Sequence, residues 1–263
     1  MIETGKKATL AVSYGTAYRM QYERTVNRIE HALAATFPER QLFSAWTSPF
    51  MRNRMEASCG MNVDSVEDAV QRMSALGVED VIIQFLLVAE GEEYERAVST
   101  VKANSACFAR MAIGRPLLSR EVDAGALAEA LSMHYAAIPE NEMLAFMAHG
   151  TPDADAPMIG CMNGAFRNKG LERFAVGTLE GRPGIEPVLA AIRGLRPKTV
   201  TVAPFMIAAG KHTLRDMAGE GERSWKSIIA REEVEVHCIL SGLGEYAETA
   251  ELFVRHAKEA EKL

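Results

Sequence analysis

Short runs of apolar residues recur along the chain and predict buried strands. The runs are nearly unbroken in apolar character, which is typical of parallel strands covered on both faces. They predict strands at Ala8–Tyr14, Gln41–Trp46, within Val78–Ala89, Met111–Leu118, Glu142–His149, Arg173–Thr178, Thr199–Ile207 and Val234–Leu240.

Between these runs, apolar positions follow the spacing of helices. From Tyr22 to Phe37 they step by three or four residues, which predicts a single helix ended by Pro38. Ser65 and Asp68 have the spacing of a capping box at the start of a second helix, and Gly77 suits its end. Further helices are predicted at Ala124–Tyr135, Ile185–Ile192, Ser224–Glu232 and Glu245–Lys262.

The two halves of the chain repeat one order of elements. SYGT at 13–16 matches AHGT at 148–151, and each ends a first strand. Residues 81–94 resemble residues 200–213, because both run from a long apolar strand into a glycine. We interpret this as an internal duplication with its seam near Ala136–Asn141. The predicted lobes are residues 1–138 and 139–263.

Strands that alternate with helices predict an α/β fold class. We expect two similar lobes, each a parallel sheet built from right-handed βαβ units with helices on both faces. A cleft between two such lobes, at the strand ends, is a favoured place for a ligand.

Three residues of the second half, His149, Glu180 and His212, each follow a predicted strand. A glycine lies beside each residue or two positions before it, and the spacings of 31 and 32 residues match one strand–helix unit. Each residue alone has an ordinary structural explanation, but the shared topology directs all three to one edge. Two imidazoles and a carboxylate there can bind a divalent transition metal and leave coordination positions open. We therefore predict a metal site.

The first half offers weaker candidates for contact with a ligand. Ser13 and Thr16, beside Gly15, could hold ligand oxygens through hydroxyl and backbone N–H groups. Glu92, in an acidic segment with Glu90 and Glu93, could face the cleft, although a solvated acidic loop explains it equally well. Four basic residues near the strand ends could meet an anionic substrate but are more simply surface charges: Arg19, Arg52, Arg54 and Lys211.

The four other histidines have structural interpretations. We expect His31 to be exposed, and His134 to lie at a helix end where its charge suits the dipole. His237 is interpreted as a packed strand residue, and His256 as part of a basic closing helix.

Composition and absent motifs narrow the function further. A net charge of −6 disfavours non-specific binding of nucleic acid. The N-terminus shows no export signal, and no apolar run is long enough to span a membrane, so we expect a cytoplasmic protein. The four scattered cysteines include no CxxC pair, and no P-loop, GxGxxG after a strand, GxSxG or HExxH motif is present.

These features together resemble one known family, the anaerobic cobalt chelatases of the class II chelatase superfamily. The landmarks are VSYGT (12–16), the turn 46–48, QFLLVAEGEEYE (84–95), AHGT, VGTLEG (176–181), PFMIAAGKHTLRDMAGE (204–220), SWKSII (224–229) and GLGEY (242–246). As an ordered set they are specific, and they cover nearly the whole chain.

The resemblance implies insertion of Co2+ into sirohydrochlorin or a related tetrapyrrole, without ATP and without an organic cofactor. The family's metal-binding residues fall on His149 in the HGT motif, Glu180 in GT-x-E and His212 in G-x-H. No nucleic-acid or membrane partner is expected, and a homo-oligomer stays open. The chain departs from the family at Leu87, where members often carry a histidine. Residues 152–170 have little apolar periodicity and are interpreted as a flexible lip of the cleft.

Three alternatives stay open from the sequence. The same scaffold could serve a ferrochelatase or a nickel chelatase, since geometry and supply rather than affinity decide the metal. Leu87 leaves room for a tetrapyrrole- or metal-binding carrier without turnover. A two-lobed solute-binding protein is disfavoured, because the expected export signal is missing.

Overall fold

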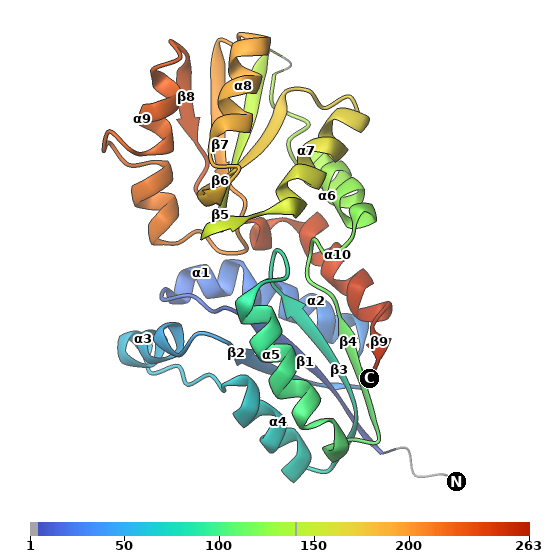
Figure 1. The fold of residues 1–263 in the computed structure, drawn as a ribbon. Helices are drawn as coiled ribbons and strands as arrows, with labels where there is room; N and C mark the ends of the chain where they lie inside the picture. The colour runs from blue at the N-terminus through green and yellow to red at the C-terminus, as the bar shows by residue number, and fades with distance from the viewer. Residues whose placement is uncertain (1–4, 140) are drawn as a thin grey trace. The chain divides into compact units, whose positions relative to one another are not determined.

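The computed structural model describes residues 5–139 and 141–263, which divide into two compact units. Unit 1 comprises residues 5–119 and 249–263, and unit 2 comprises Arg120–Glu248. Each unit contains a largely parallel sheet flanked by helices (Figure 1), so the predicted α/β fold class is confirmed. Glu140, within the predicted seam, lies outside the described residues.

The sheet of unit 1 has the strand order β2-β1-β3-β4-β9. Its first four strands pair in parallel, and β9 pairs antiparallel with β4. The strands are β1 (Lys6–Ser13), β2 (Gln41–Trp46), β3 (Val78–Leu86), β4 (Arg110–Gly114) and β9 (Glu261–Lys262). The helices are α1 (Arg19–Arg24), α2 (Val26–Thr36), α3 (Pro49–Cys59), α4 (Val66–Ala75), α5 (Glu92–Ala103), the short η1 (Ser105–Cys107) and most of α10 (Ala247–Lys258).

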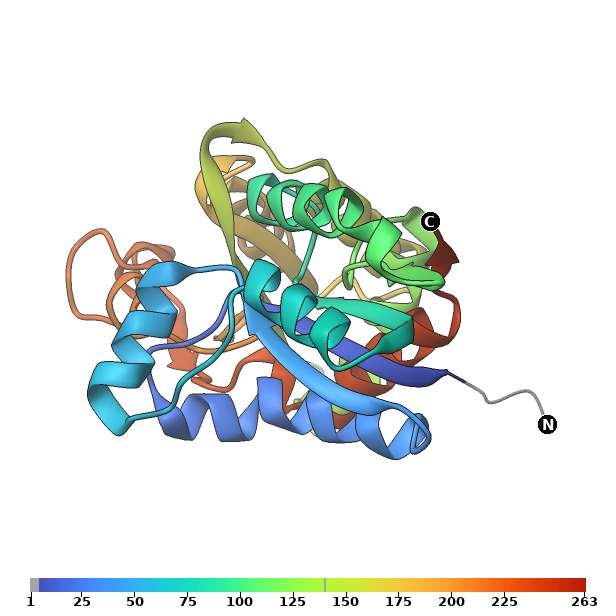
Figure 2. The ribbon, with the colours of Figure 1, turned by 90° about the horizontal axis from the view of Figure 1, so that it is seen from below.

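Helices cover both faces of this sheet. Figures 1 and 2 show α4 and α5 on one face and α2 on the other. Leu10 and Val12 of β1 pack in one cluster with Val70 of α4 and Val101 of α5. Because successive strand residues point to opposite faces, the residues between them face α2. The capping box of Ser65 and Asp68 is present, as predicted.

The sheet of unit 2 has the order β6-β5-β7-β8, with all neighbours parallel. The strands are β5 (Glu142–Asp155), β6 (Phe174–Arg182), β7 (Thr199–Pro204) and β8 (Glu235–Cys238). The helices are α6 (Glu121–His134), α7 (Pro157–Asn168), α8 (Glu186–Leu195), the π-helical turn η2 (Thr213–Met217), α9 (Trp225–Ala230) and η3 (Leu243–Glu245). In both units the first strand lies between the second and the third, which agrees with the interpretation of a duplication.

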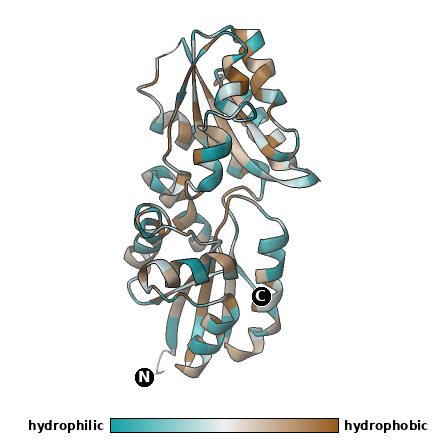
Figure 3. Ribbon diagram, turned by 90° about the vertical axis from the view of Figure 1, so that its left-hand side faces the viewer, coloured by the Kyte–Doolittle hydropathy of each residue, from teal (hydrophilic) through white to brown (hydrophobic). Residues whose placement is uncertain are grey.

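Two different cores cover the faces of this second sheet. Met143 and Met147 of β5 pack with Val188 of α8 and Ile229 of α9. On the opposite face, Phe146 stacks on Phe166 of α7, with ring centroids 6.0 Å apart. Figure 3 shows the resulting pattern, with apolar strands inside and polar outer faces on the helices. Across the described residues, no helix combines the length and apolar character needed to cross a membrane.

Several predicted elements differ from the observed ones. The single helix predicted from Tyr22 to Phe37 is broken at Thr25, which has φ −118° and ψ −89° and separates α1 from α2. The segment 152–170 was predicted to be a flexible lip, and this prediction is wrong. It contains the end of β5 and helix α7, which Pro157 begins and which buries Ile159, Met162 and Phe166. The closing helix ends at Lys258 and is followed by β9.

The two units divide the chain differently from the predicted boundary after residue 138. Helix α6 belongs to unit 2, where it packs along α7. The last residues return to unit 1, because β9 extends its sheet at Ala112 and Ile113 and the amide of Leu263 donates to the carbonyl of Met111 at 3.0 Å. Unit 2 is therefore a continuous segment inserted into unit 1.

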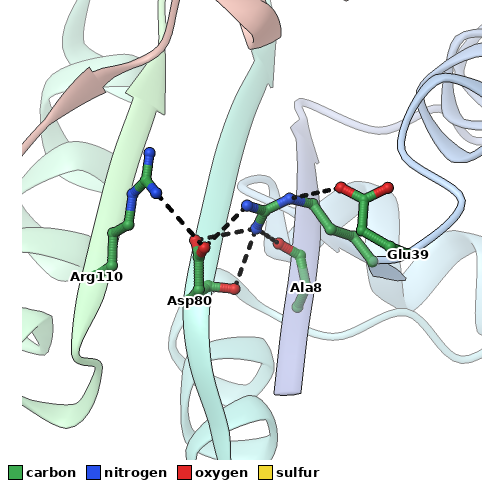
Figure 4. A network of polar contacts seen from close by, with 5 residues as sticks. Ala8, Glu39, Asp80 and Arg110 are labelled. Atoms are coloured by element: carbon green, nitrogen blue, oxygen red, sulfur yellow. Dashed lines mark hydrogen bonds and ion pairs between the residues drawn. The ribbon is translucent and has the colours of Figure 1, made fainter. Parts of the chain in front are cut away.

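A polar network ties together the amino-terminal ends of the strands of unit 1 (Figure 4). Arg40 donates two hydrogen bonds of 3.0 Å to the carboxylate of Asp80 and another, of 3.2 Å, to the carbonyl of Ala8. Arg110 lies 3.9 Å from the same carboxylate. Structural ion pairs thus occupy the amino-terminal ends of these strands. Ligands of open α/β sheets bind at the opposite, carboxyl-terminal ends.

Candidate functional site

Strands β5 and β6 bring His149 and Glu180 together at the edge of the sheet of unit 2. Burial of the two strands ends at Ala148 and Thr178, within one residue of the strand ends predicted at His149 and Thr178, but pairing continues so that Gly150 lies opposite Glu180. Nδ1 of His149 lies 3.7 Å from Oε2 of Glu180.

Gly150 makes this close approach feasible. Its φ is +76°, and a Cβ atom placed on it would lie 2.0 Å from the backbone oxygen of Glu180. Only glycine combines that conformation with the space available. The glycine beside His149, noticed in the sequence, thus sets the distance between the two strands.

His212 reaches the same place from the segment after β7. Its ring lies against that of His149, with centroids 4.8 Å apart and planes nearly perpendicular. The side chains of His149, Glu180 and His212 are 48%, 38% and 40% exposed, so all three are open to a ligand. The structure therefore brings together the three residues that the strand-end argument selected.

Each imidazole is held through its Nδ1 atom. Nδ1 of His149 lies 2.9 Å from the carbonyl oxygen of Gly150, and Nδ1 of His212 lies 2.7 Å from Oδ2 of Asp216. The other carboxylate oxygen of Asp216 accepts a hydrogen bond of 2.8 Å from Nε of Arg215. Partial burial acts to raise the pKa of Asp216, but the hydrogen bonds from Arg215 and His212 outweigh it and hold that pKa below its usual value.

Asp216 was missed by the sequence argument. Its signal is the spacing of four residues from His212, which brings two side chains together on one helical turn. That spacing is meaningful only if a helical turn forms there. The apolar residues between Gly210 and Gly219 show no helical periodicity, so no helix was predicted in this segment.

The donor atoms have the chemistry of a transition-metal site but are not arranged as a closed one. Within residues 5–139 and 141–263, no group of three or more His, Cys, Asp or Glu side chains is positioned to hold a metal ion. His149 is the central residue, with Glu180 and His212 as its neighbours.

The candidates of the first half lie at the corresponding edge of unit 1. Ser13 and Thr16 are only 2% and 4% exposed, so their hydroxyl groups are covered in this structure. Gly15, with φ +93°, packs against the ring of Trp46 and shapes the turn. Glu92 is exposed at the first position of α5, not in a loop. Their contact with a substrate stays a prediction.

The remaining histidines lie apart from this cluster or serve the fold. His31 is exposed, as expected, and His134 ends α6, where its Nδ1 lies 3.4 Å from Oε2 of Glu248. His237 was expected to be packed, but its side chain is 57% exposed and lies 3.0 Å from Glu235. The sheet ends at β8, so this edge strand lacks the cover that the prediction assumed. His256 is buried in α10.

Comparison with known proteins places the chain in a family. The family model for cobalt chelatase (CbiK) matches residues 7–262. A sirohydrochlorin cobaltochelatase of Salmonella typhimurium is 33% identical over 257 residues, which are 97% of this chain and 96% of that protein. The sirohydrochlorin cobaltochelatase CbiKC of Nitratidesulfovibrio vulgaris is 28% identical over 258 residues, 97% of this chain and 90% of that protein. The chain belongs to the CbiK cobalt chelatase family, as the sequence resemblance predicted, and is a metal chelatase.

Solved structures support the fold. SirB from Bacillus subtilis with Fe3+ matches with a TM-score of 0.66 at 14% identity, over 97% of this chain and 95% of that one. CbiX, described as the terminal enzyme for biosynthesis of siroheme in denitrifying bacteria, matches with a TM-score of 0.53 at 14% identity, over 96% and 99% of the two chains. At this identity the likeness concerns the fold alone.

Proposed function

We propose that this protein inserts Co2+ into sirohydrochlorin without ATP, and that His149, Glu180 and His212 hold the ion. The observation that supports the proposal most is the position of His149, whose ring lies beside His212 and within 3.7 Å of Glu180. The names of the relatives in the same family point to the same metal and the same tetrapyrrole.

The donor set fits the task of delivering a late first-row metal. Neutral imidazoles bind such ions well, and one carboxylate supplies negative charge. Three protein ligands leave coordination positions for the pyrrole nitrogens, which then replace the protein ligands. The exposure of all three side chains leaves them accessible to an incoming ion and to the substrate that takes it.

The reaction also requires proton transfer. A metal-free tetrapyrrole loses two N–H protons as a divalent ion enters, so a base must stand near the macrocycle. Glu180 and the two histidines are the groups of this cluster that can accept a proton. Lys211, exposed beside His212, is suited to meet a carboxylate of the substrate.

The test is insertion of Co2+ by the purified protein, followed through the absorbance of the tetrapyrrole under anaerobic conditions. His149→Ala, Glu180→Gln and His212→Ala should each lower kcat/KM by at least about 100-fold, because loss of a partner that merely supports a ligand already costs 10–100-fold in metal sites. His237→Ala is the matched control, since it removes an exposed histidine of the same unit. Equal rates for wild type and His212→Ala would contradict the assignment of His212.

The same assay separates the alternatives. Side-by-side insertion of Co2+, Fe2+ and Ni2+ compares the three metals on one scaffold. Stoichiometric binding of metal or tetrapyrrole without release of a metallated product would indicate a carrier. Turnover well above the rate without protein contradicts a carrier.

A further inference from the structure

Asp216 is fixed between two partners in the turn that follows His212. Its Oδ2 lies 2.7 Å from Nδ1 of His212, and its Oδ1 accepts from Nε of Arg215 at 2.8 Å. The side chain of Asp216 is only 19% exposed, whereas that of Arg215 is 66% exposed. With both oxygens engaged, the carboxylate cannot turn without breaking one of these contacts.

The backbone of this turn is unusual and holds the pair in place. Thr213–Met217 is a π-helical turn, in which the amide of Ala218 donates to the carbonyl of Thr213 at 3.0 Å. Such turns are rare in proteins, and those that do occur are often found at functional sites. Buried Thr213 and Met217 anchor the turn, and Met217 lies in the core under α8 and α9.

A carboxylate at Nδ1 determines which nitrogen of His212 can bind a metal. A neutral imidazole carries one proton, and a carboxylate accepts but does not donate. The proton therefore resides on Nδ1, and the lone pair is on Nε2. Hydrogen bonds of this kind orient metal-binding histidines and increase the basicity of the ligand.

His149 provides an internal comparison. Its Nδ1 lies 2.9 Å from the carbonyl oxygen of Gly150, which is also an acceptor, so its Nε2 likewise carries the lone pair. The hydrogen-bond acceptor for His149 is a neutral backbone group, with the carboxylate of Glu180 farther away at 3.7 Å, whereas the acceptor for His212 is itself a carboxylate. Both rings thus present Nε2 to a metal. The carboxylate at Nδ1 of His212 favours the Nδ1–H tautomer more strongly than the backbone carbonyl at Nδ1 of His149 does.

We propose that Asp216 is a positioning residue that fixes His212 in the Nδ1–H tautomer and aims its Nε2 lone pair at the substrate metal. The inference rests on the proposed function, because it takes His212 as a ligand of that metal. Asp216 acts through His212 and is not itself a ligand.

The experiment needs no tetrapyrrole, so it is independent of turnover. In full-length, metal-free protein with 15N-labelled histidine, two-bond 1H–15N correlation spectra report the tautomer of each ring, and His212→Gln identifies the signals of His212. The same samples are then titrated with Co2+, and binding is followed by visible absorption of the ion. The variants are Asp216→Ala, Asp216→Asn and Asp216→Glu. Glu232→Ala, which removes a carboxylate paired with Arg193 in the same unit, is the matched control.

Wild type should show the Nδ1–H tautomer at His212. Asp216→Ala should lose that preference and bind Co2+ about 10–100-fold more weakly. Asp216→Asn should be milder, because its amide oxygen still accepts the Nδ1 proton, and Asp216→Glu should recover part of the affinity. Glu232→Ala should match wild type. If Asp216→Ala does not fold, the Asp216→Asn and Asp216→Glu variants decide the same point through their smaller losses of Co2+ affinity.

Three results would overturn the inference. The first is an unchanged tautomer and Co2+ affinity in Asp216→Ala. The second is a weaker affinity with an unchanged tautomer, which would make Asp216 a ligand or a source of charge. The third is wild-type protein that does not bind Co2+. Failure of the proposed function has a different signature, namely the expected tautomer and affinity changes in a protein that never metallates sirohydrochlorin.

Discussion

Gly150→Ala should separate β5 from β6 and disrupt the cluster around His149. The added Cβ would lie 2.0 Å from the backbone oxygen of Glu180, an atom that cannot rotate away. The left-handed conformation of residue 150 costs about 1–2 kcal/mol for alanine, and overpacking against the strand adds about 1–3 kcal/mol. We expect the free energy of unfolding to fall by about 2–5 kcal/mol in total.

The effect on activity should exceed the effect on stability. A shift of β6 by about 1 Å would misplace Glu180 relative to His149, and misplacement on this scale can cost about 100-fold in rate. Urea unfolding and Co2+ insertion below the unfolding transition measure the two effects separately.

Gly170→Ala is the matched control. Gly170 lies in the same unit with φ +68°, but no atom lies within 4 Å of the position of its Cβ. This variant should carry only the conformational cost of about 1–2 kcal/mol and retain activity. If Gly150→Ala loses no more stability than Gly170→Ala and inserts Co2+ at the wild-type rate, the close approach does not organise the site.

Three further predictions concern unit 1. Arg40→Met should lower the free energy of unfolding by about 2–4 kcal/mol, since it leaves the partly buried carboxylate of Asp80 without its main partner. Arg19→Met, in an exposed pair, should leave the midpoint of the same urea titration close to that of wild type. Burial raises the pKa of Glu30 above its ordinary 4.5, although hydrogen bonds from Ser44 and Tyr22 oppose the shift. The folded protein therefore binds this proton more tightly than the unfolded chain does, and the contribution of Glu30 to stability falls as pH rises above 4.5. Glu30→Gln should become more stable relative to wild type between pH 4.5 and 7 in unfolding measurements, and a difference independent of pH would refute this. Deletion of residues 261–263 removes β9 and should lower stability by about 1–2 kcal/mol in thermal unfolding, whereas an unchanged midpoint would show that the pairing with β4 contributes nothing.

The sequence predicted the strands well because their signal is local. β2 was predicted at its observed bounds, and the capping box of α4 is present where Ser65 and Asp68 indicated it. Strand ends were placed where burial stops, yet β5 and β6 pair beyond that point because backbone hydrogen bonding does not require apolar side chains. The missed helices, α3, α5 and α7, carry short or interrupted apolar stripes, and tertiary contacts stabilise them.

The grouping of the candidate site residues was predictable from the sequence, but the contacts that support them were not. His149, Glu180 and His212 are each marked by a strand and a glycine, so topology alone brings them to one edge. Asp216 depends on a π-helical turn, and the burial of Ser13 and Thr16 depends on neighbours that are distant in sequence. Such features arise from packing between elements, which a periodicity within one element does not encode.

The return of the chain to unit 1 has a consequence for which parts of the chain each unit needs to complete its fold. Unit 2 is continuous from Arg120 to Glu248, so every residue of the proposed metal site lies within that one segment. Without residues 249–263, unit 1 lacks most of α10 and the strand that covers β4. Because domains fold as units, unit 2 can fold without residues 249–263, whereas unit 1 presents an open sheet edge until that segment pairs with β4.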